Sequence, residues 1–356
     1  MPFVRVNAGD AESIQALTDL YNAARVVDDP TSPPAIAELV AGDVEFGWDL
    51  HPDTRYLYTP PGGERPVGLV AVDMPVYDNL QLIWAEVLVH PDHRRLGHGT
   101  VLMEEVLRQA REAGRTIIWV GTASDDLGAQ AFVEKFGFSY ASHDARRRQQ
   151  LAEVDSEELA RLHAQASEAA KDYRLERLMS PVPDEVLAEL LEVTAAINDA
   201  PAGDLTYEDE VFDVARLREV ETARQKRGDL MYRIVARHKE TGEAAGHTVV
   251  VYNALRPNRA GQGDTAVARD HRGHRLGMLL KIAMMHWLAG EQPQLESIET
   301  WNNADNSYMI NVNEAIGYRL SRIYNMYELK LEGARAYGQA SEAVDNYAGD
   351  AVGGDA

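Results

Sequence analysis

The chain has 356 residues, of which 45% are hydrophobic and 26% are charged, and 35 basic against 57 acidic side chains give a formal net charge of −22. This is the composition of a globular protein, not of a mainly disordered, collagen-like or membrane-embedded chain, and its length favours two domains. The acidity argues against broad binding to nucleic acids or anionic membranes, and the absence of cysteine excludes disulfides, cysteine-ligated zinc, iron–sulfur clusters and a cysteine nucleophile.

The N-terminal residues 1–10 lack the apolar stretch of a signal peptide. Nowhere does an uncharged apolar run approach the roughly 18 residues that a membrane span needs. We therefore expect a cytoplasmic protein, monomeric or homodimeric, with no nucleic-acid partner and no membrane partner.

Hydrophobic periodicity divides the first part of the chain into alternating helices and strands. Helices are expected at 12–24, 101–113 and 128–135, and strands at 54–59, 66–72, 80–89 and 116–120. The segment 138–151 is expected to form strands at the edge of a sheet, with Arg146, Arg147 and Arg148 as an exposed strand end. The tryptophans of the apolar segments are expected in the core: Trp84, Trp119, Trp287 and Trp301.

A polar, alanine-rich helix at 157–170 separates this part from a second one in which the pattern restarts. Helices are then expected at 184–196, 278–289 and 306–315, and strands at 173–178, 230–237, 245–252, 265–268, 297–301 and 321–331. The expected division is a first domain at 1–152, a helical linker at 153–172, a second domain at 173–332 and a flexible acidic tail at 333–356.

Two segments of the chain, Glu86–Gly99 and Asp264–Gly277, repeat one pattern. Each runs from a carboxylate through a strand to Asp-His-Arg, a glycine-containing loop and a helix. Arg94 and Arg272, which occupy the same place in the pattern, are 178 residues apart, half the chain length. One fold used twice is therefore expected.

The loop in this repeat has the features of an anion site. The free backbone N–H groups and the dipole of a helix N-terminus attract anions, and glycine lets the backbone approach a phosphate closely. Arginine and histidine flank both loops although the chain as a whole is acidic. The two familiar phosphate motifs, the P-loop and the Rossmann glycine pattern, are absent. A phosphate-bearing ligand at each loop is the economical interpretation.

The spacing Arg94-x-x-Gly97-x-Gly99 resembles the signature of the Gcn5-related N-acetyltransferase (GNAT) family, and the flanking strands and helices resemble that family as well. The resemblance implies an α/β (α+β) fold with two tandem GNAT domains, each a twisted, mixed and mostly antiparallel sheet flanked by helices. It also implies acetyl-CoA as co-substrate, with its pyrophosphate on the loop and its pantetheine arm along the preceding strand.

The residues that the resemblance assigns to acetyl-CoA lie on that strand, on the loop and at the start of a later helix. In the first copy they are Val87, Leu88, Val89, Arg94, Arg95, Leu96, Gly97, His98, Gly99, Thr100 and Asp126. In the second copy they are Thr265, Ala266, Val267, Arg272, Gly273, His274, Arg275, Leu276, Gly277, Met278 and Asn306.

The second copy departs from the family pattern at Arg275, which replaces the first glycine of the signature. This crowds the backbone approach but adds a cation near the phosphates. Many family members also carry a tyrosine as general acid on the later helix, and that position is Val133 in the first copy and Asn313 in the second. Of the two, Asn313 can still donate a hydrogen bond to the thiol sulfur, which leaves the second copy as a plausible catalyst.

Glu86 and Asp264 each precede the loop strand, where family members often place the general base that deprotonates the attacking ammonium. The alternative is an edge carboxylate that faces solvent or pairs with arginine. An acidic run suits a cationic amine, although such a run is more often a solvated loop: Asp204, Glu208, Asp209, Glu210 and Asp213. Neither His271 and His274 nor His286 has the spacing of a metal site, so no metal is expected.

The expected function is an acetyl-CoA-dependent N-acetyltransferase that acylates the primary amine of a small molecule by direct transfer. Glu86, Asp264 and Asn313 are its candidate catalytic residues, and the sequence does not decide which copy works. Two alternatives stay open. One is a non-catalytic acetyl-CoA sensor or scaffold, which the missing tyrosine motivates, and the other is a protein lysine acetyltransferase.

Overall fold

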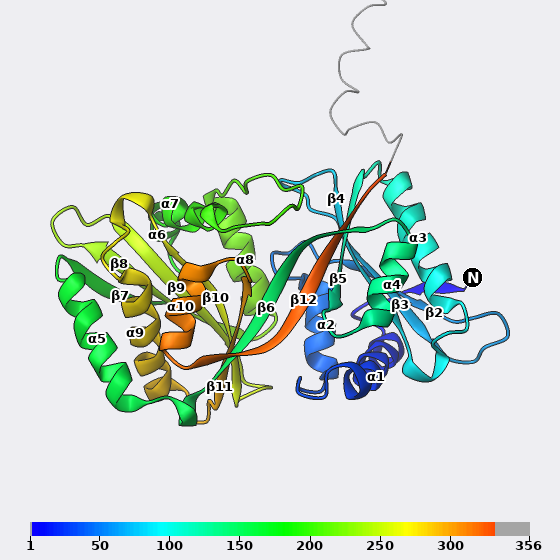
Figure 1. Ribbon diagram of the computed structural model, residues 1–356, viewed down its shortest axis with the longest axis horizontal. Coiled ribbons are helices and arrows are strands. Elements are labelled where there is room, and N and C mark those ends of the chain that lie inside the picture. The colour runs from blue at the N-terminus through cyan, green and yellow to red at the C-terminus, as the bar shows by residue number, and fades with distance from the viewer. Residues whose placement is uncertain (1, 332–356) are drawn as a thin grey trace, which may run out of the picture.

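The computed structural model describes residues 2–331, and the tail expected at 333–356 lies outside them. Figure 1 shows two halves joined by a pair of long central strands. The N-terminal half contains β1 (Phe3–Arg5), α1 (Ala11–Asp28), α2 (Ala37–Phe46), β2 (Thr54–Tyr58), β3 (Gly68–Asp73), β4 (Leu82–Val89), α3 (His98–Glu112), β5 (Ile117–Ala123), α4 (Leu127–Lys135) and β6 (Ser139–Gln150).

Helix α5 (Ser156–Ala169) leads into the C-terminal half. That half contains β7 (Tyr173–Met179), α6 (Asp184–Glu189), α7 (Leu191–Ala195), α8 (Val214–Lys226), β8 (Asp229–His238), β9 (Ala244–Asn253), β10 (Arg259–Val267), α9 (Leu276–Glu291), β11 (Ser297–Asn303), α10 (Ser307–Ala315) and β12 (Tyr318–Lys330). The expected helix at 184–196 is thus divided into α6 and α7.

The strands of both halves form one mixed sheet with the order β1-β2-β3-β4-β5-β12-β6-β11-β10-β9-β8-β7. The last strand of each half is exchanged: β12 pairs with β5, β6 pairs with β11, and the two lie antiparallel to each other at the centre. The proposed division at residues 152 and 172 therefore describes the order of elements along the chain, since the two halves complete each other's sheets.

The exchange corrects the expectation for residues 138–151. This segment is a single strand at the middle of the sheet, with β12 on one side and β11 on the other. Arg146 and Arg147 are buried instead of forming an exposed strand end, and Arg146 reaches Asp29 with an Nη1–Oδ2 distance of 2.7 Å. Three consecutive arginines are typical of an exposed segment, but here carboxylates of both halves pair with them: Asp29 comes from the N-terminal half, and Glu299 and Glu314 come from the C-terminal half.

Most neighbouring strands are antiparallel, and the two parallel pairs occupy equivalent places in the two halves. β4 pairs with β5 only from Leu82 to Trp84, and β10 pairs with β11 only from Arg259 to Gly261. Beyond these short stretches the strands diverge. This agrees with the expected twisted, mostly antiparallel sheet in each half and leaves one edge of β4 and of β10 without a strand partner.

The main helices cover the sheet through apolar faces. α3 packs onto the N-terminal half through Leu102, Met103 and Val106, and α9 packs onto the C-terminal half. Helix α5, expected as a linker, buries Leu162 and Ala166 in the same core as α9. Within residues 2–331 no helix has both the length and the apolar character to cross a membrane.

Candidate active site

The first loop leaves β4 through a short turn and reaches α3 at Gly97, which caps the helix in a left-handed conformation. Arg95 and Gly97 both have positive φ values, of 64° and 90°. The backbone N–H groups of residues 95–99 donate no hydrogen bond to any part of the described chain. A cluster of free amides at a helix N-terminus is an anion site.

The second loop has the same backbone shape with its residue types exchanged. Gly273 and Arg275 have φ values of 88° and 54°, so glycine stands where the first loop has Arg95, and arginine where it has Gly97. Arg275 thus adopts the left-handed conformation itself, and its Nη1 lies 3.0 Å from the Oε1 of Gln165 on α5. The amides of residues 273–278 are likewise without acceptors within residues 2–331.

Arg94 and Arg272 each hold their loop to the preceding strand through an equivalent hydrogen bond. The Nε of Arg94 donates to the carbonyl oxygen of Val89 at 3.1 Å, and the Nε of Arg272 donates to that of Val267 at 3.1 Å. The Arg94 guanidinium also binds both carboxylate oxygens of Asp28, at 2.7 and 2.6 Å. Because each arginine ties its loop to the strand before it, each acts first as a brace for the loop conformation.

A cavity of about 1020 Å³ opens where β4 and β5 diverge. Five of the residues predicted from the sequence line it: Glu86, Val87, Leu88, Arg94 and Asp126. The other predicted residues of this copy lie on the strand end, the loop and the start of α3: Val89, Arg95, Leu96, Gly97, His98, Gly99 and Thr100. Asp126 also caps α4, since its Oδ1 accepts from the amide of Ala129 at 2.9 Å.

The C-terminal half contributes part of the wall of this first cavity. Trp301 comes from β11, and Arg322, Tyr324 and Met326 come from the exchanged strand β12. Trp301 is 49% exposed and Trp84 on β4 is 43% exposed, so two of the tryptophans expected in the core line the cavity instead. Sequence reasoning missed Arg322, Tyr324 and Met326 as residues of this cavity, because the exchange of β12 between the halves leaves no local signal.

Glu86 lies where the first cavity meets a second, smaller one of about 380 Å³ on the α2 side of the sheet. Three further carboxylates line the smaller cavity: Asp43, Asp53 and Asp73. The hydroxyl of Tyr21 donates to the Oε2 of Glu86 at 3.2 Å. The surrounding protein raises the pKa of Glu86 by desolvation, against the opposing effect of Arg55, and burial raises the pKa of Asp73 to about 6. This site is suited to accept a proton from an ammonium group.

The corresponding cleft of the C-terminal half measures about 400 Å³. Nine predicted residues line it: Thr265, Ala266, Val267, Arg272, Gly273, Arg275, Leu276, Gly277 and Asn306. The remaining two, His274 and Met278, lie on the loop and on α9. Asn306 caps α10 with its Oδ1 3.1 Å from the amide of Met309, as Asp126 caps α4.

The two predicted catalytic residues of this half are placed less favourably than Glu86. Asp264 is exposed, as Glu86 is, but it lies at an irregularity of β10 and does not line the 400 Å³ cleft, although desolvation raises its pKa against the effect of Arg233. Asn313 is fully buried, and its Nδ2 donates to the Oδ1 of Asn302 at 2.8 Å. A buried amide held in this way is not presented to a thiol in the cleft.

The acidic run of the second half is held by structural contacts: Glu208 joins the two halves, while Glu210 and Asp213 act within their own half. The Oε2 of Glu208 accepts from the amide of Asn79 at 3.2 Å, and the Oε1 of Glu210 lies 2.9 Å from Arg216. Asp213 caps α8. The acidic wall of a cavity comes instead from the carboxylates around Glu86. Residues 2–331 hold no group of histidine and carboxylate side chains arranged to bind a metal ion.

Comparison with known proteins places this geometry in context. The model of the acetyltransferase (GNAT) family matches residues 14–138. Mycothiol acetyltransferase from Saccharomonospora viridis is 34% identical over 240 residues, which cover 66% of this chain and 70% of that enzyme. An uncharacterised N-acetyltransferase of Methanocaldococcus jannaschii is 31% identical over 99 residues, 26% of this chain and 43% of that protein.

Solved structures extend the match to nearly the whole chain. A tandem GNAT protein from the clavulanic acid biosynthesis pathway has a TM-score of 0.76 and 26% identity, covering 92% of this chain and 98% of that one. A GCN5-related N-acetyltransferase from Sphaerobacter thermophilus has a TM-score of 0.67 at 16% identity over 92% of this chain and 96% of that one, which shows a shared fold.

Proposed function

This chain belongs to the GNAT family of acetyltransferases, and we propose that it transfers the acetyl group of acetyl-CoA directly to the primary amine of a small molecule, at the cleft of the N-terminal half. As a member of that family it is an N-acetyltransferase. The acceptor, the direct transfer and the working half are the parts that we propose here.

The residues of the first cleft fit acetyl-CoA. The free amides of residues 95–99 suit its pyrophosphate, since they point at an anion from a helix N-terminus. The edge of β4 beyond Trp84, which has lost its partner β5, offers backbone groups to the pantetheine arm and to the thioester oxygen. Val87 and Leu88 lie on that edge and line the cavity.

The position of Glu86 is the observation that carries the proposal. Its carboxyl group lies between the cavity that suits acetyl-CoA and an acidic cavity that suits an ammonium group. A carboxylate there can take the proton of the ammonium, because only the neutral amine attacks a thioester. Holding both reactants against one strand supplies much of the rate.

The missing tyrosine on α4 does not prevent this reaction. Val133 stands in its place and donates no proton. However, a thiol has a pKa of about 8.5, so a thiolate is a fair leaving group near neutral pH. The thiolate can leave as such, and the nitrogen then loses its second proton, which passes through water to the thiolate. The nitrogen keeps the acetyl group, and Glu86 holds the first proton, the one that the ammonium released before attack.

Turnover with a panel of amines tests the proposal. The purified chain is incubated with acetyl-CoA and aminosugars, polyamines, amino-acid derivatives or lysine peptides, and thiol release and product mass are followed. Acetylation of a small amine is the expected result. Tight binding of acetyl-CoA without thiol release for any amine would favour a sensor, and preference for lysine peptides would favour a protein acetyltransferase. Either result contradicts the proposal.

A further inference from the structure

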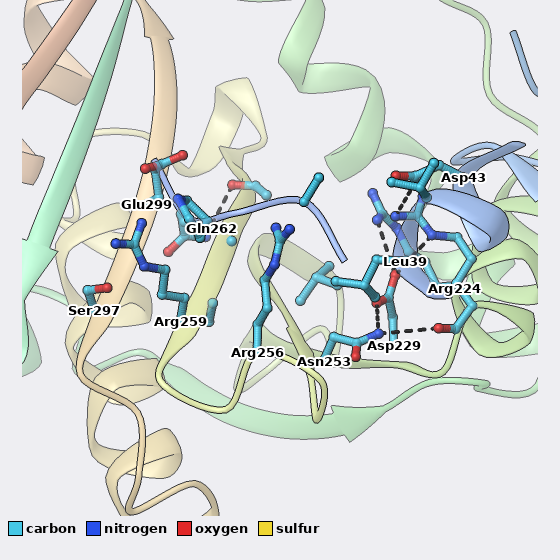
Figure 2. Close-up of a pocket in the computed structure, with 18 of the residues that line it drawn as sticks. Leu39, Asp43, Arg224, Asp229, Asn253, Arg256, Arg259, Gln262, Ser297 and Glu299 are labelled. Atoms are coloured by element: carbon cyan, nitrogen blue, oxygen red, sulfur yellow. Dashed lines mark hydrogen bonds and ion pairs between the residues drawn. The ribbon is translucent and has the colours of Figure 1, made fainter. Parts of the chain in front are cut away.

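A third cavity, of about 550 Å³, lies between the two halves (Figure 2). The N-terminal half contributes the segment around α2, including Pro33, Ala35 and Leu39. The C-terminal half contributes the turn between β9 and β10 and the start of β10, including Arg256 and Arg259. The cavity exists only because the halves are joined.

The wall of this cavity is rich in arginine although the chain has a net charge of −22. The arginines are Arg55, Arg148, Arg224, Arg227, Arg256 and Arg259. Three carboxylates share the wall, Asp43, Asp229 and Glu299. Each of these three already binds an arginine other than Arg256 and Arg259: they bind Arg227, Arg224 and Arg148, respectively.

Arg256 and Arg259 form no ion pair with a carboxylate anywhere in residues 2–331. The Nη2 of Arg256 donates to the carbonyl oxygen of Pro34 at 2.9 Å, and the Nη2 of Arg259 donates to that of Thr31 at 3.4 Å. Figure 2 shows both side chains projecting from the β9–β10 region into the cavity. Their guanidinium groups are thus held in place by neutral oxygens and keep their charge.

Two nitrogen atoms of this pair, Arg256 Nε and Arg259 Nη1, are buried without a hydrogen-bond partner in the described chain. Burial lowers the pKa of Arg256, and burial together with the neighbouring cation of Arg148 lowers the pKa of Arg259. Charges that are removed from water without compensation destabilise a fold. An oxyanion between these two side chains would satisfy their donors and their charge, as arginine pairs do with carboxylates and phosphates.

The arginine cavity adjoins the acidic cavity of Glu86. The two share Asp43, Arg55 and Arg227 in their walls. Tyr21 also lines the arginine cavity, while its hydroxyl binds Glu86. A ligand that places an anionic group at Arg256 and Arg259 can therefore extend along these shared residues toward the proposed general base.

We propose that the acceptor is an amine that also carries a carboxylate or phosphate group, and that Arg256 and Arg259 bind this anionic group while Glu86 receives the amine. This inference rests on the proposed function, because it assigns the substrate class of that site. Neutral amines and polyamines would fill the acidic cavity and leave the two arginines without a counter-charge.

The test compares matched amines on the wild-type chain and on the variant Arg256→Gln/Arg259→Gln. The amines are glucosamine against glucosamine 6-phosphate, and an α-amino amide against the corresponding amino acid. We expect kcat/KM for one anionic member to exceed that of its neutral partner at least tenfold and the double variant to abolish this preference. The arm that shows the preference distinguishes phosphate from carboxylate. The control Arg65→Gln removes one exposed positive charge from the β2–β3 loop, away from the cavity, and should change nothing.

A second readout separates this proposal from the proposed function. Inorganic phosphate and acetate are each titrated at constant ionic strength while thermal unfolding is followed, without acetyl-CoA. We expect at least one anion to stabilise the wild-type chain and the Arg65→Gln control more than the double variant, in which only the two loops remain to bind it. This result with no turnover of any amine would uphold the anion site and contradict the proposed function. Turnover with no preference, or equal stabilisation of all three proteins, would overturn the anion site.

Discussion

The two halves of the molecule share a loop but differ in what surrounds it. Both loops have two left-handed residues, free amides at a helix N-terminus and an arginine that braces the loop to its strand. The first cavity measures about 1020 Å³ and reaches an acidic neighbour through Glu86, whereas the second measures about 400 Å³ and is not lined by Asp264. The free amides are thus a local feature that both loops share, while the cavities differ in the elements that converge on each loop.

The helices that follow the two loops also differ, at one buried position. Met103 on α3 and Lys281 on α9 occupy equivalent places, 178 residues apart, and are 1% and 2% exposed. Lys281 has no carboxylate partner within residues 2–331, and its Nζ lies 5.1 Å from the centre of the Tyr318 ring. The N-terminal half keeps an apolar core at this point, and the C-terminal half buries an amine.

Removal of the two candidate bases should have the largest effect. Glu86→Gln is expected to lower kcat/KM by about 10²- to 10⁴-fold, the usual contribution of general base catalysis, and Asp264→Asn by less than about threefold. The base acts in its deprotonated form, and the pKa of Glu86 is raised. The wild-type rate should therefore rise with pH around a pKa above that of an ordinary glutamate. Steady-state profiles of both variants measure this, and a large loss in Asp264→Asn alone would assign catalysis to the C-terminal half.

A negative charge introduced at each loop tests whether both loops bind the pyrophosphate of acetyl-CoA. Gly99→Glu and Gly277→Glu should each weaken acetyl-CoA binding to one half at least about tenfold, or about 1.4 kcal/mol, by repelling the pyrophosphate. Calorimetric titration resolves the two sites. The matched neutral variants Gly99→Gln and Gly277→Gln are needed because a Cβ at Gly99 would lie 3.3 Å from the Phe132 ring, whereas at Gly277 nothing lies within 4 Å. Equal effects of glutamate and glutamine would show that charge is not the cause.

Lys281→Met copies the residue of the first half into the second and should stabilise the protein. Burial lowers the pKa of Lys281 to about 7, against about 10.4 in the unfolded chain, so between these values the unfolded state binds more protons. Wild-type stability should therefore rise with pH over this window. At pH 7 the variant should gain up to about 4 kcal/mol in the free energy of unfolding, at about 1.4 kcal/mol per pH unit.

Urea unfolding at pH 7 and pH 9 measures this difference. The advantage of Lys281→Met should shrink at the higher pH, because the wild-type lysine is then less protonated in the unfolded state. An advantage that does not depend on pH would show that packing, and not the charge of Lys281, separates the two proteins. Met103→Lys, the reverse change, should destabilise the N-terminal half at pH 7.

Replacing Arg275 by glycine, the residue at the same place in the first loop, should give the smallest effect. Arg275→Gly relieves a left-handed side chain, worth about 1–2 kcal/mol, but the glycine also gives the unfolded chain more freedom. It also removes the contact with Gln165. We expect a net change in unfolding free energy below about 1 kcal/mol, measured by urea unfolding, with Arg95→Gly as the matched variant in the first loop. A loss above about 2 kcal/mol would show that Arg275 is a structural residue.

The elements that were predicted correctly are those whose signal lies within a short window. The strand–loop–helix segments around Arg94 and Arg272 carry their own glycines, caps and apolar faces, so the sequence alone located the loops and the family. The expectation of an exposed strand end at 146–148 was wrong because the burial of these residues depends on partners far away in the chain. Arg146 is buried because Asp29, more than a hundred residues away in the chain, is its partner.

The sequence by itself determined that one acetyltransferase fold is used twice and that each copy has a loop with the features of an anion site, because backbone conformation at a helix N-terminus is a local matter. Only the tertiary structure decided which copy is better equipped. The exchange of β6 and β12, the meeting of two cavities at Glu86 and the unpaired Arg256 and Arg259 all join residues that lie far apart in the chain. Such neighbours follow from packing the two halves together, and no spacing within either half encodes them.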